Sequence, residues 1–222
     1  MSYPFNAERK AKVMVVDDHA IVRQGMSMLI NREEDMHACC EAADIEQAVE
    51  ANRSCPHDIA IVDISLTNES GLELVRRFQF LFPKLPILIL SMHDESIYAE
   101  AALKAGARGY LMKQMATDVL LHAIRKILQG DMYVSEQMHA RMLKKLMSGA
   151  DESSPIGNLS TTELEVLHLI GLGMGTSDIA EKLSRSIKTI ESHKANIKKK
   201  LSLDNANQLT LFAINLAASR VG

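Results

Sequence analysis

The length, composition and charge of the chain exclude several classes of protein. Its 222 residues exceed a single domain of common size (about 100–200 residues), and 47% hydrophobic with 24% charged residues indicates a globular chain rather than a disordered or fibrous one. The apolar runs fall short of the roughly 18 residues that a membrane span needs, and the N-terminus lacks the apolar core of a secretory signal, so we expect a cytoplasmic protein that does not enter a membrane.

The formal charge of −3 is distributed unevenly. Residues 1–155 carry 17 basic and 22 acidic side chains, whereas residues 156–222 carry 8 basic and 6 acidic ones. An acidic front and a basic back predict two modules with different partners. We expect a first domain at 10–130, a linker helix and flexible linker at 131–155, and a second domain at 156–222.

The first module has the pattern of strands that alternate with helices. Short runs rich in Val and Ile predict strands at 12–16, 36–41, 59–62, 87–90 and 109–112. Helical spacing of apolar residues predicts helices at 21–31, 45–52, 71–82, 95–105 and 116–128. Strict alternation requires right-handed crossovers, so the predicted fold is α/β and doubly wound, with a five-stranded parallel sheet covered on both faces.

Polar side chains follow four of these predicted strands. Asp17 and Asp18 follow the first, Asp63 the third, Ser91 the fourth and Lys113 the fifth. Because the carboxyl ends of parallel strands share one edge of the sheet, these groups should converge. Three adjacent carboxylates repel one another unless a hard cation joins them, which favours Mg²⁺. With a lysine and a hydroxyl available to a phosphoryl group, Asp63 is the predicted nucleophile that forms an aspartyl phosphate.

This constellation resembles the receiver domain of two-component response regulators. The motifs are "DD" after the first strand, "D" after the third, "S" after the fourth and "GARGYLMK" through the fifth. The resemblance implies a flavodoxin-like fold and phosphate transfer from a sensor histidine kinase to Asp63. It implies that Mg²⁺ is held by Asp17, Asp18, Asp63 and the carbonyl of Ser65. It also implies a phosphate-binding and switch set that comprises Ser91, Met92, Lys113 and Tyr110.

The sequence departs from the receiver pattern in two places, at three residues in all, and neither change removes a group that contacts the phosphate. Thr67 and Asn68 stand where many relatives have Pro-Gly, and Gln114 stands where a carboxylate commonly follows the lysine. The first difference bears on the rigidity of the loop after Asp63 and on the lifetime of the phosphate.

The remaining metal-ligating residue types favour ordinary roles. His19 and His93 have no partner at metal-ligand spacing, so solvated or capping roles are expected. Cys39, Cys40 and Cys55 are odd in number and also lack such spacing, so we expect reduced, mostly buried and inert thiols.

The segment between the modules and the start of the second one carry helix signals. Met138, Met142 and Leu143 lie on one face of a predicted sixth helix, and residues 148–158 are rich in Gly, Ser and Pro. Ser160 and the Glu three residues later predict a capping box, Thr176 is the predicted N-cap of the next helix, and Ser186 caps a third.

The second module resembles the four-helix DNA-binding module of NarL/FixJ/LuxR-type regulators. The match runs through "LSTTELEVL", "SDIAEKL" and "SIKTIESHKANIKKKL", and it implies that a helix at about 188–200 lies in a major groove. Ile190, Ile197 and Leu201 would face inward, and Glu191 could accept from a cytosine amino group. The predicted DNA-binding residues are Ser186, Lys188, Thr189, Glu191, Ser192, Lys194, Ala195, Asn196 and Lys199.

The last predicted helix, at 205–218, suggests pairing of two chains. Leu209, Phe212 and Ala213 belong to one apolar arc, but Leu211 and Ile214 lie outside it. One core face does not account for Leu211 and Ile214, so we expect them to form a dimer contact rather than to be simply buried. Dimers are also expected because weakly basic modules need paired half-sites on DNA for affinity.

Together these features predict a phosphorylation-gated bacterial transcription regulator rather than an enzyme, with covalent chemistry confined to Asp63. Its expected partners are a histidine kinase, double-stranded DNA with paired half-sites and a second copy of the chain, and contact with RNA polymerase is left open. One alternative is a regulator that binds DNA without phosphorylation. Another is a Mg²⁺-dependent phosphohydrolase, which lacks an evident general acid beside Asp63 and leaves the helix-turn-helix unexplained.

Overall fold

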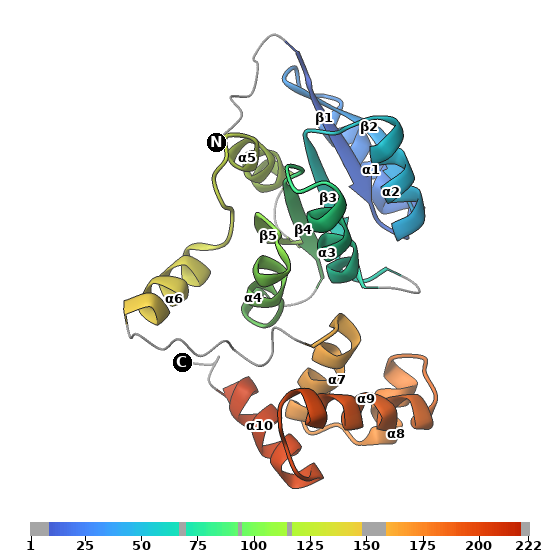
Figure 1. The fold of residues 1–222 in the computed structure, drawn as a ribbon, viewed down its shortest axis with the longest axis vertical. Coiled ribbons are helices and arrows are strands. Elements are labelled where there is room, and N and C mark those ends of the chain that lie inside the picture. Colours follow the sequence, from blue (N-terminus) through green and yellow to red (C-terminus); the bar gives the residue numbers. More distant parts are fainter. Residues whose placement is uncertain (1–8, 67–69, 93–94, 115–116, 148–158, 219–222) are drawn as a thin grey trace. The chain divides into compact units, whose positions relative to one another are not determined.

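The computed structural model describes residues 9–66, 70–92, 95–114, 117–147 and 159–218. The chain forms two compact units, 1–151 and 152–222, and each is described by itself (Figure 1). Within the described ranges, no helix combines the length and the apolar character that crossing a membrane requires.

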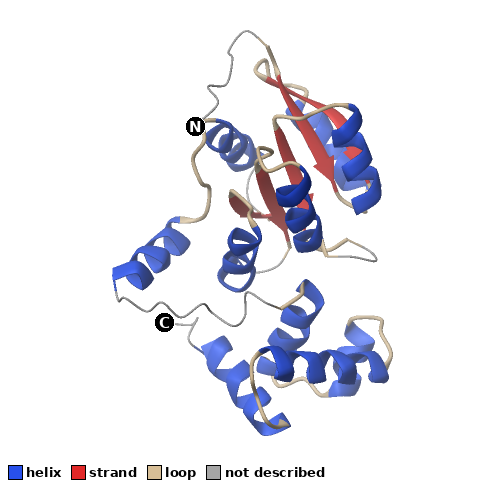
Figure 2. Ribbon diagram, in the orientation of Figure 1, coloured by secondary structure: helices blue, strands red, loops and turns tan. Residues whose placement is uncertain are grey.

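The first unit is built on a five-stranded sheet whose neighbours all pair in parallel (Figure 2). The order β2-β1-β3-β4-β5 places the switch point of the chain between β1 and β3. The predicted doubly wound fold is confirmed. The strands are β1 (Ala11–Val16), β2 (Met36–Ala42), β3 (Ile59–Asp63), β4 (Ile87–Ser91) and β5 (Gly109–Met112).

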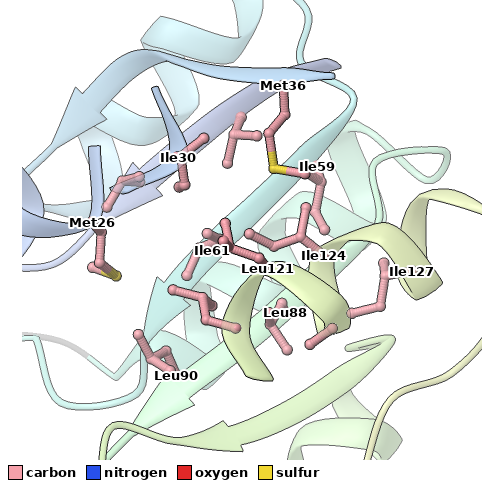
Figure 3. Close-up of a cluster of buried hydrophobic side chains, with 14 of the residues drawn as sticks. Met26, Ile30, Met36, Ile59, Ile61, Leu88, Leu90, Leu121, Ile124 and Ile127 are labelled. Carbon is pink, nitrogen blue, oxygen red and sulfur yellow. The ribbon is translucent and has the colours of Figure 1, made fainter. Parts of the chain in front are cut away.

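Five helices connect and cover these strands. They are α1 (Ala20–Ile30), α2 (Ile45–Ser54), α3 (Gly71–Leu81), α4 (Glu95–Ala105) and α5 (Thr117–Leu128). The helices α1 and α5 bury their apolar faces on one side of the sheet, where Ile30, Ile61 and Ile124 belong to one core (Figure 3). Burying one such side chain contributes about 1.5–3 kcal/mol, so this layer holds the strands, and the residues that follow them, in fixed positions.

The edge strand β2 contains a bulge. Val13 pairs with Ala38 and Met14 pairs with Cys40, so Cys39 is an extra residue in the ladder. Cys39, Cys40 and also Cys55 are free thiols, but each is only partly buried. The expectation of mostly buried cysteines was therefore wrong, because two of them lie on the outermost strand of the sheet.

The helix α6 (Glu136–Met147) follows the sheet, as predicted, and the second unit is entirely helical. Its helices are α7 (Thr161–Gly171), α8 (Thr176–Lys182), α9 (Ile187–Lys200) and α10 (Ala206–Ala218). The helix α7 packs against both α9 and α10, and α8 packs against α9. The predicted small four-helix domain is thus confirmed.

Two of the three predicted helix caps in this unit are confirmed. The Ser160 hydroxyl accepts from the backbone N–H of Glu163 while the Glu163 carboxylate accepts from that of Ser160, which is a complete capping box. Ser186 accepts from the N–H of Thr189. The prediction for Thr176 was wrong, because the N-cap of α8 is Gly175, whose own N–H is satisfied by a downstream carboxylate.

Candidate functional site

The switch point brings together acidic and basic side chains from three strand ends. The Lys113 Nζ lies 2.6 Å from an Asp17 carboxylate oxygen and 2.8 Å from an Asp63 carboxylate oxygen. Asp17 has no exposed surface, Asp63 is 4% exposed and Lys113 is 13% exposed. Groups separated by as many as 96 positions in the chain therefore form one buried cluster with two anions and one cation.

The electrostatics of the cluster leave negative charge only partly compensated. Burial raises the pKa of Asp63, and the nearby Asp17 adds to this, while Lys113 opposes it. For Lys113, burial alone would lower the pKa, but its hydrogen bonds to Asp17 and Asp63 and their charges together raise it. The lysine therefore stays protonated, and two carboxyl groups share this one ammonium, an arrangement that can accommodate a further cation.

The adjacent residues add oxygen and nitrogen ligands. Asp17, Asp18, His19 and Asp63 each offer a ligand atom within 4.8 Å of the others. The His19 Nδ1 lies 2.6 Å from an Asp18 oxygen, and the His19 backbone N–H donates to Asp17 at 2.9 Å. Three carboxylates at this spacing match the ligands that Mg²⁺ prefers. The His19 ring is largely exposed, yet its contact with Asp18 was not foreseen from sequence.

The other predicted phosphate-binding residues lie along the same edge. Ser91 is fully buried at the end of β4, where its carbonyl accepts from the N–H of Lys113 at 2.7 Å. Tyr110 is fully buried within β5, whereas Met92 is exposed. Ser65 is exposed just beyond β3. The structure thus joins the backbones of Ser91 and Lys113 and places the aromatic ring of Tyr110 inside the unit.

Two residues that support the cluster were not predicted. Arg23 in α1 donates to the carbonyl of Asp17, which holds the turn after β1. A Cβ atom added to Gly71 would lie 2.0 Å from the carbonyl oxygen of Asp63. Only glycine permits α3 to begin so close to this backbone. The signal in the sequence that could have predicted this close approach is a glycine at the start of the helix that follows the third strand.

The second candidate site is the outward face of α9. Ile190 and Ile197 are fully buried, whereas Lys188, Ser192 and Lys199 are exposed, so the predicted two-sided helix is confirmed. Ala195 and Asn196 are also exposed. This face presents ammonium, hydroxyl and amide groups to solvent.

Two predicted DNA-binding residues take part in a polar contact between α8 and α9. The Glu191 Oε1 accepts from the Thr176 hydroxyl at 3.0 Å and from Lys194 Nζ at 3.1 Å, and Lys194 also donates to Thr176 at 2.9 Å. This use of the Thr176 side chain also explains why it does not cap α8. The contact fixes the angle between the two helices.

An ion pair between an exposed lysine and a buried carboxylate joins the other end of α9 to α7. The Lys200 Nζ lies 2.7 Å from the Glu163 carboxylate, which is nearly fully buried and is part of the capping box. Burial alone would raise the pKa of Glu163, but hydrogen bonds from Lys200 and from the Ser160 backbone outweigh it and lower the pKa. One carboxylate therefore anchors both helices.

The last helix has exposed apolar side chains outside its buried face. Leu209 and Ala213 are buried, whereas Leu211 is 61% exposed and Ile214 is 44% exposed. The two exposed side chains are three positions apart and lie on one side of the helix.

Some predicted features fall outside the described residues. These are Thr67, Asn68, His93 and the linker at 148–158.

The first unit is doubly wound and carries a cluster of carboxylates and a lysine at its switch point, and the second unit is a helix-turn-helix. This combination is typical of a regulator that is controlled by a signal. Residues 13–125 match the family described as response regulator receiver domain, and residues 157–213 match bacterial regulatory proteins of the luxR family. The chain belongs to the LuxR-family response regulators.

Similar proteins cover nearly the whole chain. The oxygen regulatory protein NreC of Staphylococcus epidermidis is 39% identical over 210 residues, which are 91% of this chain and 96% of that protein. NreC of Staphylococcus carnosus is 37% identical over 209 residues, again 91% and 96% of the two chains. RcsB from Salmonella enterica, solved bound to a promoter with the phosphomimetic BeF₃⁻, is 28% identical with a TM-score of 0.59, over 95% of this chain and 100% of that one.

Proposed function

We propose that this protein is a DNA-binding transcription regulator of a bacterial two-component system, and that phosphorylation of Asp63 controls its binding to DNA. The observation that carries the proposal is the bridge from Lys113 to Asp17 and Asp63, in a chain whose second unit presents a two-sided polar helix. Residues 10–130 would receive the signal, 131–155 would connect and 156–222 would bind DNA.

The proposed chemistry is transfer of one phosphoryl group. An Asp63 carboxylate oxygen attacks the phosphorus of a phosphohistidine on the kinase, a P–O bond forms, the P–N bond breaks and the electron pair stays on the imidazole. Asp17, Asp18, Asp63 and the Ser65 carbonyl would hold Mg²⁺, which supplies positive charge for the phosphoryl oxygens. No turnover of small phosphate esters is expected.

The residues at the ends of β4 and β5 would bind and report the phosphate. Lys113 would exchange a carboxylate partner for a phosphoryl oxygen, while the Ser91 hydroxyl donates to another, with Met92 beside it. Movement of Ser91 would couple to Tyr110, whose ring is buried in β5. The pair then biases an equilibrium between two conformations of the first unit.

On DNA, the exposed face of α9 would lie in the major groove. Lys188 and Lys199 would contact phosphates, while Asn196 and Ser192 would reach base edges. Both hydrogen bonds that Glu191 accepts end on Oε1, so we assign Oε2 to a cytosine amino group. Ser186, Thr189, Lys194 and Ala195 complete the proposed interface.

The lysines of α9 give a direct test of this interface. Lys188→Ala and Lys199→Ala should each weaken binding to all sequences and reduce the slope of log affinity against log salt by about 1. Lys144→Ala, an exposed lysine of α6, is the matched control. An unchanged salt slope in both α9 variants would contradict the proposed orientation of the helix.

The dimer contact is tested separately. Leu211→Lys and Ile214→Lys should abolish cooperative binding to paired half-sites while leaving binding to one half-site intact, because both side chains are exposed and their loss costs the fold little. Unchanged dimerisation on DNA would remove Leu211 and Ile214 from the interface.

The gate is tested by mobility shift on genomic fragments. Wild type and Asp63→Ala are compared with Mg²⁺ and acetyl phosphate or with neither, and Asp131→Ala replaces an exposed carboxylate as the control. We expect the phosphodonor to tighten binding for wild type and the control only. Equal binding in all arms would favour the regulator that does not need phosphorylation, and repeated turnover of a phosphomonoester instead of one-to-one labelling would favour the hydrolase.

A further inference from the structure

A second group of metal-ligating atoms lies away from the phosphoacceptor site. Sulfur atoms of Cys39 and Cys40 and a ring nitrogen of His57 all lie within 4.8 Å of one another. His57 precedes the amino end of β3, whereas Asp63 closes the carboxyl end of the same strand. Cys39 and Cys40 lie in the middle of β2, so this group is set back from the carboxyl edge of the sheet that carries Asp17 and Asp63.

The bulge in β2 explains how neighbouring cysteines reach one site. Side chains that follow each other in a regular strand point to opposite faces of the sheet. Here the ladder passes from Ala38 to Cys40 and leaves Cys39 unpaired, and such an insertion re-aims the side chains around it. Both thiols can thus lie on the side from which His57 approaches.

The imidazole of His57 has the orientation and the tautomer that suit a metal ligand. Its Nδ1 lies 2.9 Å from the side-chain oxygen of Asn52, a buried residue of α2. Its Nε2 is buried and has no hydrogen-bond partner among the residues that the structure describes. An amide oxygen that accepts from Nδ1–H selects the tautomer whose Nε2 carries a lone pair, as carbonyl groups do behind metal-bound histidines. Burial and the nearby Lys12 lower the pKa of His57, which keeps the ring neutral.

We propose that Cys39, Cys40 and His57 bind a divalent cation of the Zn²⁺ type through two thiolates and one imidazole. Sulfur and nitrogen ligands select such a cation over Mg²⁺, which prefers the carboxylates at the carboxyl edge of the sheet. Three protein ligands leave a fourth position, which solvent can fill because all three residues are only partly buried.

Binding at this site displaces protons. Burial and the neighbouring thiols Cys40 and Cys55 raise the pKa of Cys39 to about 11, so the metal-free thiol is protonated. Each cation that binds forms two metal–sulfur bonds and releases the two thiol protons to solvent. Affinity should therefore rise with pH.

Cys55 provides a matched control inside the same region. Its sulfur lies 3.5 Å from the Lys12 ammonium and is not among the three grouped ligands. With only three cysteines in the chain, metal binding should protect two thiols from a thiol reagent and leave Cys55 reactive.

The experiment is a titration of the reduced full-length protein with Co²⁺, a spectroscopic substitute for Zn²⁺. We expect thiolate-to-cobalt charge-transfer absorption that saturates at one equivalent, disappears when Zn²⁺ is added, and persists in excess Mg²⁺. Cys39→Ser, Cys40→Ser and His57→Gln should each weaken binding at least tenfold, whereas Cys55→Ser should bind as wild type does.

Several results would overturn the proposal. The first is the absence of a charge-transfer band in wild type. The second is an undiminished band in the double variant that carries Cys39→Ser and Cys40→Ser. The third is that Zn²⁺ protects fewer than two thiols of the wild-type protein from the reagent. The thiol count uses wild-type protein, so it decides the question even where a variant fails to fold. Circular dichroism of each variant without metal separates lost ligands from lost structure.

Discussion

Replacing Lys113 by methionine removes the positive charge from the phosphoacceptor cluster while keeping most of the side-chain volume. Asp17 and Asp63 then face each other, at 0% and 4% exposure, without the ammonium that lies 2.6 and 2.8 Å from them. Removing one partner of a buried ion pair costs about 3–5 kcal/mol. Because the lysine is 13% exposed and a carboxylate can take up a proton, we expect a cost below that range, about 2–3 kcal/mol at pH 7.

The assay is thermal and urea unfolding of the full chain at pH 7 in a chelator. For a unit of about 150 residues, a loss of 2–3 kcal/mol lowers its Tm by roughly 5–10 °C. Mg²⁺ should restore part of the loss in Lys113→Met. Lys104→Met is the control, because Lys104 pairs with Glu100 on the surface of α4 and such a pair contributes about 0.3–0.5 kcal/mol.

Two further results follow from the same electrostatics. Burial raises the pKa of Asp63, so its ionised form costs stability above that pKa, and the cost disappears as the pH falls through it. The deficit of Lys113→Met should therefore shrink on acidification. Adding Asp63→Asn to Lys113→Met should recover stability, since one of the facing carboxylates is gone. A double variant less stable than Lys113→Met, or a Lys113→Met variant as stable as wild type, would refute the reasoning.

Two other predictions concern stability. Gly71→Ala should cost about 1–3 kcal/mol in urea unfolding, because its Cβ would meet the Asp63 carbonyl oxygen at 2.0 Å. Gly25→Ala, in the middle of α1, should instead stabilise by about 0.5–1 kcal/mol, because its Cβ would meet no described atom outside its own stretch of helix within 4 Å. Equal effects of the two substitutions would contradict this difference in packing. Because the pKa of Glu163 is lowered, its ionised carboxylate stabilises the second unit at pH values above the ordinary glutamate pKa, and this stability is lost as the pH falls through the pKa of the folded state. Glu163→Gln should therefore make the stability of the second unit fall less steeply with acidification. An unchanged acid dependence would exclude a stabilising pair with Lys200.

The elements of both units were predictable because their signals are local. Alternating runs of β-branched residues and helical spacing placed all five strands within about two residues of their ends. The predicted cap at Thr176 failed because its hydroxyl bonds to Glu191, a contact between helices that local pattern does not encode.

The phosphoacceptor cluster was predictable because topology alone brings strand ends together. Asp17, Asp63 and Lys113 needed only the strand order to be recognised as neighbours. The group at Cys39 and His57 was not, since it depends on one extra residue in the ladder between β1 and β2. A bulge changes which face a side chain takes, and no spacing rule in the sequence reports it.

The ion pair between Lys200 and Glu163 has a consequence for how a signal can act on the second unit. The same carboxylate caps α7, the first helix after the linker, and holds the far end of α9. The start of the domain and α9, the helix that we propose reads DNA, are thus tied by one carboxylate. Unfolding α9 would break the cap and the ion pair together. Control that moves an already folded α9 to or from DNA therefore costs less free energy than control that folds and unfolds this helix.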